Sequence, residues 1–105
     1  MDEIQIAFIG GSGLYKVPGL KKVKWTKVSS SFGEPSDEIC VGFLNNMKIA
    51  FLPRHGRKHK LSPSEINYRA NIDSIKSLKI KNIISISAVG SLRSDYKPGD
   101  LVLVQ

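Results

Sequence analysis

The chain has 105 residues, enough for one small domain with a modest hydrophobic core. Its 41% hydrophobic and 24% charged residues are typical of ordered globular proteins, which excludes global disorder. The formal charge of +7 favours anionic partners such as phosphate, nucleotides or nucleic acid, although dispersed lysines are also common on an ordinary solvated surface.

Two strands are predicted before the first long polar loop. Residues 4–9 form an apolar run that Gly10 ends, which indicates a short buried strand. Residues 22–28 alternate basic or polar residues with apolar ones, so Val23 and Trp25 are expected to lie on one half-buried face.

A hairpin is predicted in the middle of the chain. Residues 39–44 and 47–52 are apolar runs of strand length, and Asn45 and Asn46 separate them. Because asparagine tolerates the positive φ angles of a tight turn, this pair predicts a two-residue connection between antiparallel strands.

A helix is predicted to follow the polar stretch PRHGRKHKL. Ser62 has the chemistry of an N-cap, Pro63 suits the first helical position, and Glu65 completes a capping box. The helix is expected to run to about residue 78. Its predicted inward residues are Ile66, Ala70, Ile75 and Leu78.

The last third of the chain predicts two more strands, a buried one at residues 82–88 and another at residues 101–104. Strands, a hairpin, a helix and further strands indicate an α/β sheet in which helix-connected strands run parallel. The chain stops on an apolar strand, and one helix cannot cover both faces of a sheet. We therefore expect residues 1–105 to be an incomplete α/β fold.

Cysteine content and hydropathy predict a cytoplasmic protein. Cys40 is the single cysteine, so an intrachain disulfide is excluded and a buried thiol is expected. No apolar run approaches the roughly 20 residues that span a membrane. The acidic start, MDEIQ, lacks the basic and apolar regions of a signal peptide.

The stretch IGGSGL places a glycine-rich loop directly after the first predicted strand. The Walker A pattern fails because Lys16 follows a tyrosine and precedes a valine, and the dinucleotide fingerprint lacks its third glycine. A compact turn with several N–H donors and the Ser12 hydroxyl suits one small oxyanion. A tight turn without a ligand remains an alternative for the loop alone.

Other polar residues are predicted to lie at strand ends, where loops of α/β sheets gather ligands. Arg54 and His55 follow the second strand of the hairpin, and Ser87 lies at the end of a later strand. Arginine offers bidentate donors to a phosphate. His59, within the basic cluster RKHK, is either a further ligand or an exposed surface residue.

Five motifs in register resemble the trimeric purine nucleoside phosphorylase family, and most closely its branch that acts on 5′-methylthioadenosine. They are IGGSGL, FGEPSD, RHGRKH, PSEINYRAN and AVGSL…KPGDLVLV, and together they cover nearly the whole chain. The resemblance implies a mixed central β-sheet flanked by helices. It also implies a pentosyltransferase of purine and methionine salvage that cleaves methylthioadenosine with inorganic phosphate, giving adenine and 5-methylthioribose 1-phosphate.

The resemblance also implies particular residue roles and partners. Phosphate would be bound by Ser12, Arg54, His55, Ser87 and the backbone N–H of Ala88. Relatives commonly have threonine at the positions of Ser12 and Ser87, and serine keeps the hydroxyl. The implied co-substrate is inorganic phosphate with no organic cofactor or metal, and the complete protein is expected to be a homotrimer or a hexamer, with no nucleic-acid or membrane partner.

Family members are more than twice as long as this chain, so the resemblance implies that residues 1–105 are the N-terminal portion of a single α/β nucleoside phosphorylase domain. Residues that hold the base and the sugar are expected beyond residue 105. No catalytic acid is assigned, and the 105 residues alone are expected to be inactive. One alternative is a phosphorylase of guanosine, inosine or methylthioinosine. Others are a non-catalytic fragment and a small basic domain that binds RNA or another polyanion through RKHK.

Overall fold

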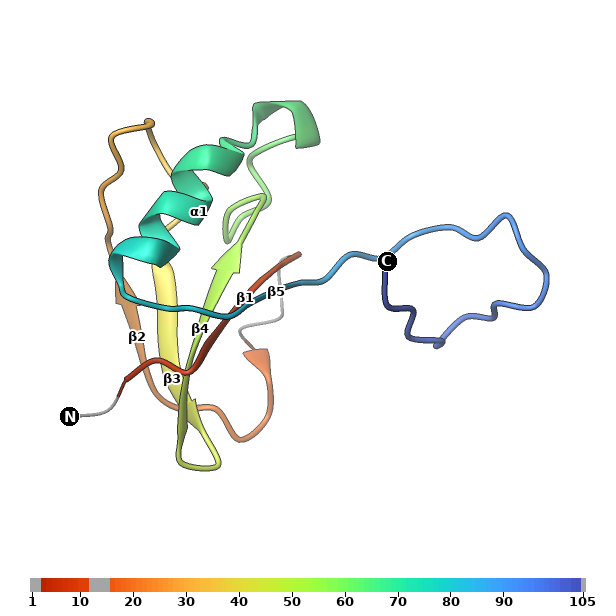
Figure 1. The fold of residues 1–105 in the computed structure, drawn as a ribbon, viewed down its shortest axis with the longest axis horizontal. Coiled ribbons are helices and arrows are strands. Elements are labelled where there is room, and N and C mark those ends of the chain that lie inside the picture. The colour runs from red at the N-terminus through yellow and green to blue at the C-terminus, as the bar shows by residue number, and fades with distance from the viewer. Residues whose placement is uncertain (1–2, 12–15, 105) are drawn as a thin grey trace.

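The computed structural model describes residues 3–11 and 16–104, which form a five-stranded sheet with one α-helix packed on it (Figure 1). The strand order is β2-β3-β4-β1-β5. The elements are β1 (Ile6–Gly10), β2 (Lys21–Thr26), β3 (Ile39–Leu44), β4 (Met47–Pro53), the 3-10 turn η2 (Pro63–Glu65), α1 (Tyr68–Ser77) and β5 (Ile83–Ser85).

The sheet is mixed, as the family resemblance implied. Strand β1 pairs in parallel with β4 on one side and with β5 on the other, whereas β2–β3 and β3–β4 are antiparallel. Strands β4 and β5, which α1 connects, therefore run in the same direction with β1 between them. This insertion places the carboxyl ends of three parallel strands at one edge of the sheet.

The core has a layer on each face of the sheet. Between the sheet and α1 lie Ala7, Ile9, Ile39, Val41, Ala50, Leu52, Ile75 and Ile80. On the opposite face Cys40, Ile49 and Phe51 are buried, and the Phe51 ring stacks on Phe8 with centroids 5.2 Å apart. Cys40 is the predicted buried thiol: it is fully buried and unpaired with another cysteine.

The predicted hairpin is confirmed. Asn45 and Asn46 have φ angles of 49° and 69°, the left-handed values that a two-residue turn of this class requires. The resulting register pairs Leu44 with Met47 and Cys40 with Phe51. The turn residues therefore set which side chains of the two strands face each layer of the core.

The prediction of one helix from residue 62 to residue 78 is wrong in its first turn. Ser62 and Glu65 close a single 3-10 turn, in which the Ser62 N–H donates to Glu65 Oε1 at 3.0 Å. Ile66 is then extended, and α1 begins afresh after Asn67, whose side chain accepts the Ala70 N–H at 3.0 Å. Asparagine is a strong N-cap, so its local hydrogen bond competes with continuation of the helix.

The predicted inward face of the helix is nevertheless correct. Ile66, Ala70 and Ile75 are buried, and Leu78 packs against the same core while partly exposed. The spacing of apolar residues thus identified the buried side although it missed the interruption at Ile66.

The alternation predicted for β2 holds only in part. Trp25 is half-buried, but Val23 is 47% exposed. The pairing with β3 shifts register between Lys21 and Lys24, and Lys22 has a φ of 54°. Such a bulge breaks the two-residue period of the strand, so Val23 no longer lies on the packed face.

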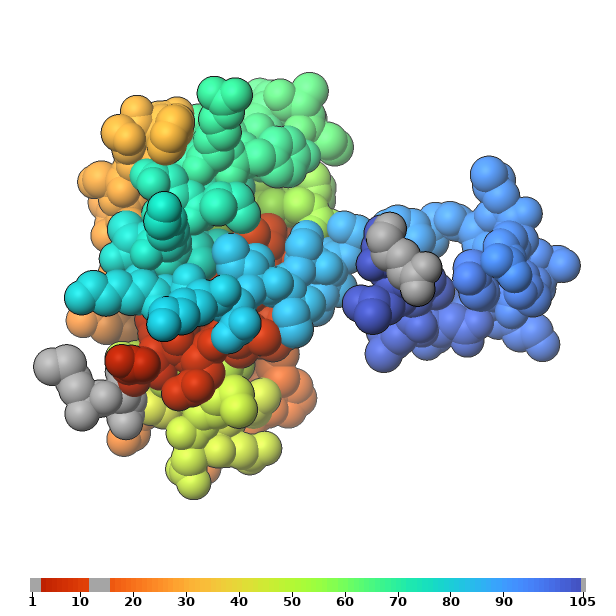
Figure 2. All heavy atoms as spheres, in the orientation of Figure 1, coloured from red at the N-terminus to blue at the C-terminus, as the bar shows by residue number. Residues whose placement is uncertain are grey.

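The last predicted strands differ most from the structure. Strand β5 spans Ile83–Ser85 and is exposed, and residues 101–104 form no strand and are also exposed. Figures 1 and 2 show residues beyond β5 leaving the body of the molecule as a projecting loop. Among the described residues no neighbour pairs with the outer edge of β5, which is why this apolar segment is not buried.

Candidate functional site

Three segments leave the sheet side by side at the carboxyl ends of β4, β1 and β5. The Arg54 N–H donates to the Gly10 carbonyl at 3.0 Å, and the Ile86 N–H donates to the Ile9 carbonyl at 2.8 Å. These hydrogen bonds extend the parallel ladders by one residue past the strands. The glycine loop, the Arg54-His55 pair and the segment from Ile86 onward therefore begin at one place, as predicted from their positions at strand ends.

Arg54 links two of these segments through its side chain. Its Nη1 donates to the carbonyl oxygen of Ile86 at 2.7 Å. Ser87 and Ala88 follow Ile86 directly and are exposed. The structure thus brings Arg54 beside the predicted Ser87-Ala88 strand end, and this hydrogen bond restrains the guanidinium at that position.

His55 is held by a reciprocal pair of hydrogen bonds with Leu61. The His55 Nδ1 lies 2.8 Å from the Leu61 carbonyl oxygen, and the Leu61 N–H donates to the His55 carbonyl at 3.1 Å. Because a carbonyl oxygen only accepts, Nδ1 carries the hydrogen, which leaves Nε2 as the ring nitrogen available to a ligand. The loop between the two residues turns at Gly56, whose φ of +83° favours glycine.

Ser12 lies outside the described residues, so its predicted place in the site is not part of this geometry. The neighbouring Gly10 and Gly11 are described, and Gly10 ends β1 beside Arg54. The roles of Ser12, Arg54, His55, Ser87 and Ala88 in binding phosphate stay predictions.

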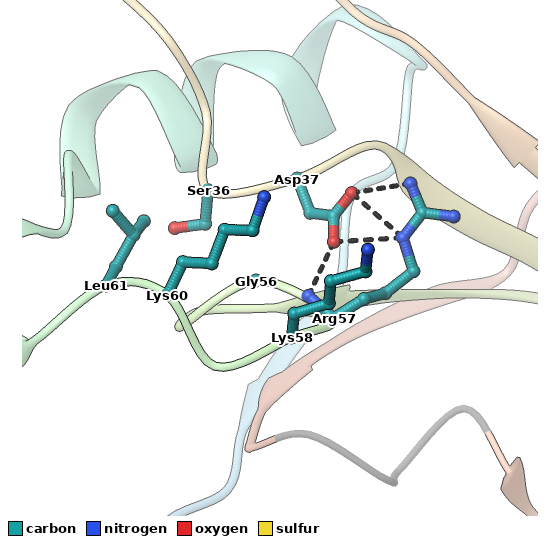
Figure 3. Close-up of a pocket in the computed structure, with 7 residues that line it drawn as sticks. All are labelled: Ser36, Asp37, Gly56, Arg57, Lys58, Lys60 and Leu61. Atoms are coloured by element: carbon teal, nitrogen blue, oxygen red, sulfur yellow. Dashed lines mark hydrogen bonds and ion pairs between the residues drawn. The ribbon is translucent and has the colours of Figure 1, made fainter.

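A cation clamp beside this region was missed by sequence reasoning. Asp37 accepts hydrogen bonds from the Arg57 backbone N–H at 2.7 Å and from Arg57 Nη2 at 2.9 Å (Figure 3). Glu38 also accepts from Nη2, at 3.0 Å. The guanidinium also lies over the Trp25 ring, 4.0 Å from its centroid. Hydrogen bonding to Asp37 raises the pKa of Arg57 above its ordinary value.

The clamp reassigns one member of the RKHK cluster. Arg57 is committed to Asp37, Glu38 and Trp25, so it is not a freely solvated contact for a polyanion. The sequence signal that could have indicated these ion pairs is the acidic pair at positions 37 and 38, which lies in a polar loop. A sequence alone does not show which of the basic residues such a pair selects.

The loop that carries Asp37 is anchored to α1 by a buried asparagine. Asn71 is 2% exposed, and its Oδ1 accepts the Ser36 N–H at 2.8 Å while its Nδ2 donates to Ser36 Oγ at 2.9 Å. Both functional groups of the amide are therefore satisfied on one residue of the loop. The anchor fixes Asp37, and through Asp37 it fixes the loop that follows His55.

A hollow of about 470 Å³ opens beside the clamp (Figure 3). Its lining combines two lysines with parts of the His55–Leu61 loop and of the Asp37 loop: Ser36, Asp37, Gly56, Arg57, Lys58, Lys60 and Leu61. Within residues 3–11 and 16–104, no group of three or more His, Cys, Asp or Glu side chains could hold a metal ion. No helix in that described part is long and apolar enough to cross a membrane.

Comparison of the sequence with known proteins identifies its family. The sequence profile described as the phosphorylase superfamily matches residues 5–105. S-methyl-5′-thioadenosine phosphorylase of Hyperthermus butylicus is 57% identical over 98 residues, which are 93% of this chain and 36% of that protein. The enzyme of the same name from Thermofilum pendens is 48% identical, over 97% of this chain and 39% of its own.

Solved structures agree with the sequence comparison. A methylthioadenosine phosphorylase sourced from an antarctic soil metagenomic library superposes with a TM-score of 0.88 at 49% identity, over 95% of this chain and 35% of that one. Methylthioadenosine phosphorylase from Schistosoma mansoni in complex with adenine gives a TM-score of 0.81 at 42% identity, over 93% of this chain and 35% of that one. The chain spans between about a third and two fifths of the length of these relatives. The predicted resemblance and fold class are confirmed, and the chain belongs to the phosphorylase superfamily.

Proposed function

We propose that the protein containing this chain cleaves 5′-methylthioadenosine with inorganic phosphate, giving adenine and 5-methylthioribose 1-phosphate. The reaction makes it a pentosyltransferase of purine and methionine salvage, in which residues 1–105 supply the phosphate side of the site. The names of its relatives support the substrate, because those from Hyperthermus butylicus and Thermofilum pendens are both S-methyl-5′-thioadenosine phosphorylases.

The observation that carries the proposal is the position of Arg54. Its backbone pairs with Gly10 at the start of the glycine loop, and its guanidinium reaches Ile86 beside Ser87 and Ala88. A permanently charged, planar donor thus lies where three loops begin, and such a donor suits the tetrahedral oxygens of phosphate. The hydroxyls of Ser12 and Ser87 and the N–H of Ala88 would complete the coordination.

The proposed chemistry rests on positioning an anion. Phosphate attacks the anomeric carbon of the ribose as the bond to the purine nitrogen breaks, so positive charge develops on the sugar in the transition state. Arg54 and His55 would hold the phosphate beneath that carbon, and the phosphate's own negative charge stabilises the developing cation. His55 would contact phosphate through Nε2, which would accept the O–H of a monohydrogen phosphate, since Nδ1 donates to Leu61.

The remaining partners are proposed on the same basis. Phosphate is itself the nucleophile, so the reaction requires no organic cofactor and no metal. We also propose that the complete protein is a cytoplasmic homotrimer, or a hexamer built from two trimers. This proposal rests on the membership of the chain in the phosphorylase superfamily.

The test is phosphate-dependent release of adenine from methylthioadenosine by the purified full-length protein. Adenine and methylthioribose 1-phosphate are expected in equal amounts, with no reaction when phosphate is omitted. Inosine, guanosine and methylthioinosine serve as competing substrates, and a higher kcat/KM for one of them would replace the proposed substrate. Absence of phosphorolysis with all four nucleosides would overturn the proposed function.

A further inference from the structure

We propose that His59 is a positioning residue for His55, acting on the proposed phosphate site through ring stacking and without contacting the phosphate. The inference rests on the proposed function, and it assigns a role to the one histidine that this function leaves unused. The two imidazole rings stack with centroids 4.5 Å apart and an angle of 27° between their planes.

The stack completes the restraint that Leu61 begins. The hydrogen bond from His55 Nδ1 to the Leu61 carbonyl holds one edge of the ring at 2.8 Å. This hydrogen bond alone would still let the His55 ring rotate about the axis from Nδ1 to the carbonyl oxygen, which would tilt the ring and move Nε2. A second ring packed against the face of His55 opposes this tilt, so hydrogen bond and stack together define where Nε2 points.

The backbone conformation of the loop holds His59 in a defined position. Its φ is 54°, in the left-handed region that a non-glycine residue seldom adopts. Its N–H donates to the Gly56 carbonyl at 3.0 Å, which closes a turn inside the larger ring that His55 and Leu61 form. His59 is exposed, so burial in the core does not account for this conformation. The turn directs its ring back onto His55.

Three substitutions separate stacking from other roles of the imidazole. His59→Phe keeps a ring but removes the ring nitrogens, so stacking survives and hydrogen bonding does not. His59→Asn removes the ring, keeps polar atoms and tolerates a positive φ, so the turn is preserved. His59→Ala removes both the ring and the polar side-chain atoms. Lys58→Ala in the same loop is the matched control, because it removes a charge but no stacked ring.

The measurements are the KM for phosphate, the KM for methylthioadenosine and kcat of the full-length protein, with the Kd of inorganic phosphate determined separately by titration calorimetry. His59→Ala and His59→Asn are expected to raise the phosphate KM and Kd about 3- to 10-fold, the range that the energy of an aromatic pair produces. The nucleoside KM should stay within about 2-fold. His59→Phe and Lys58→Ala should both stay within about 2-fold of the wild type in phosphate affinity.

Each contrary result has a defined meaning. Phosphate affinity that is unchanged in His59→Ala, or equally weakened in Lys58→Ala, would overturn the positioning role. Weak binding by His59→Phe with normal binding by His59→Asn would show a hydrogen-bonding role in place of stacking. Failure of the wild-type protein to bind phosphate would overturn the proposed function together with this inference, whereas phosphate binding that is insensitive to residue 59 would overturn this inference alone.

Discussion

Replacement of Arg54 by alanine is the sharpest test of the proposed phosphate site. One donor of the guanidinium, Nη1, is engaged by the Ile86 carbonyl at 2.7 Å, and the other side of the fork remains to face a phosphate. A hydrogen bond to a charged group contributes about 1.5–3 kcal/mol. Loss of a bidentate contact should therefore cost about 3–5 kcal/mol of phosphate binding, which corresponds to a rise of roughly 150- to 5,000-fold in the phosphate KM.

A conservative variant separates the contribution of the Arg54 charge to phosphate binding from that of the planar guanidinium geometry. Arg54→Lys keeps the positive charge but cannot hold the Ile86 carbonyl and present a planar fork to phosphate at once. We expect its phosphate KM to rise about tenfold, between the wild type and Arg54→Ala. Arg69→Ala, which removes an exposed arginine of α1, is the control for loss of charge and should leave the phosphate KM unchanged.

The assay is the initial rate of adenine release across a range of phosphate concentrations at saturating methylthioadenosine. Circular dichroism and thermal unfolding of each variant would show that the fold is retained. An Arg54→Ala enzyme with a normal phosphate KM would refute the assignment of Arg54. So would a defect confined to the nucleoside KM, because Arg54 is proposed to contact the anion and not the sugar or base.

Three further predictions concern the stability and titration of the fold. Asn71→Ala should lower the free energy of unfolding by about 2–4 kcal/mol, since it removes two hydrogen bonds and leaves the Ser36 N–H without its acceptor. Chemical denaturation measures this loss, and a loss below about 0.5 kcal/mol would contradict the proposed anchoring of the loop by Asn71. Burial raises the pKa of the Cys40 thiol, so a thiol reagent at pH 8 should label the native protein far more slowly than the protein in urea, and equal rates would contradict its burial. Hydrogen bonding to the backbone of Ser62 lowers the pKa of Glu65, so the stability that Glu65 contributes as a cap is present above its unfolded-state pKa and is lost as pH falls through its folded-state pKa. An NMR titration of the Glu65 carboxyl should give a midpoint below the ordinary value, and an ordinary midpoint would exclude this hydrogen bond.

Local chemistry made much of the fold predictable. Asn45 and Asn46 adopt the positive φ angles of the expected turn, and Ile75 lies on the expected buried face of α1. Both features depend on residues close together in the chain, whose preferences a sequence displays directly. The helix start was misplaced because Asn67 and Ser62 are both good caps, and local chemistry alone did not decide between them.

The candidate site was predictable as a set of strand ends but not as a geometry. Arg54, His55 and the Ser87-Ala88 pair were singled out as candidates by their places after apolar runs, since ligands gather at such edges in α/β sheets. The sequence did not show that the Arg54 side chain is tied to Ile86, or that Arg57 turns away from its basic neighbours toward Asp37.

The sequence by itself therefore determined the family, the positions of β1, β3, β4 and the turn between β3 and β4, and the residue types available to bind an anion, because these depend on local pattern. Tertiary structure alone decided that β1 lies between β4 and β5, which gathers residues more than seventy positions apart at one edge of the sheet. It also decided that β5 is exposed although apolar. Burial and pairing depend on which distant elements supply a neighbour, and no local pattern carries that information.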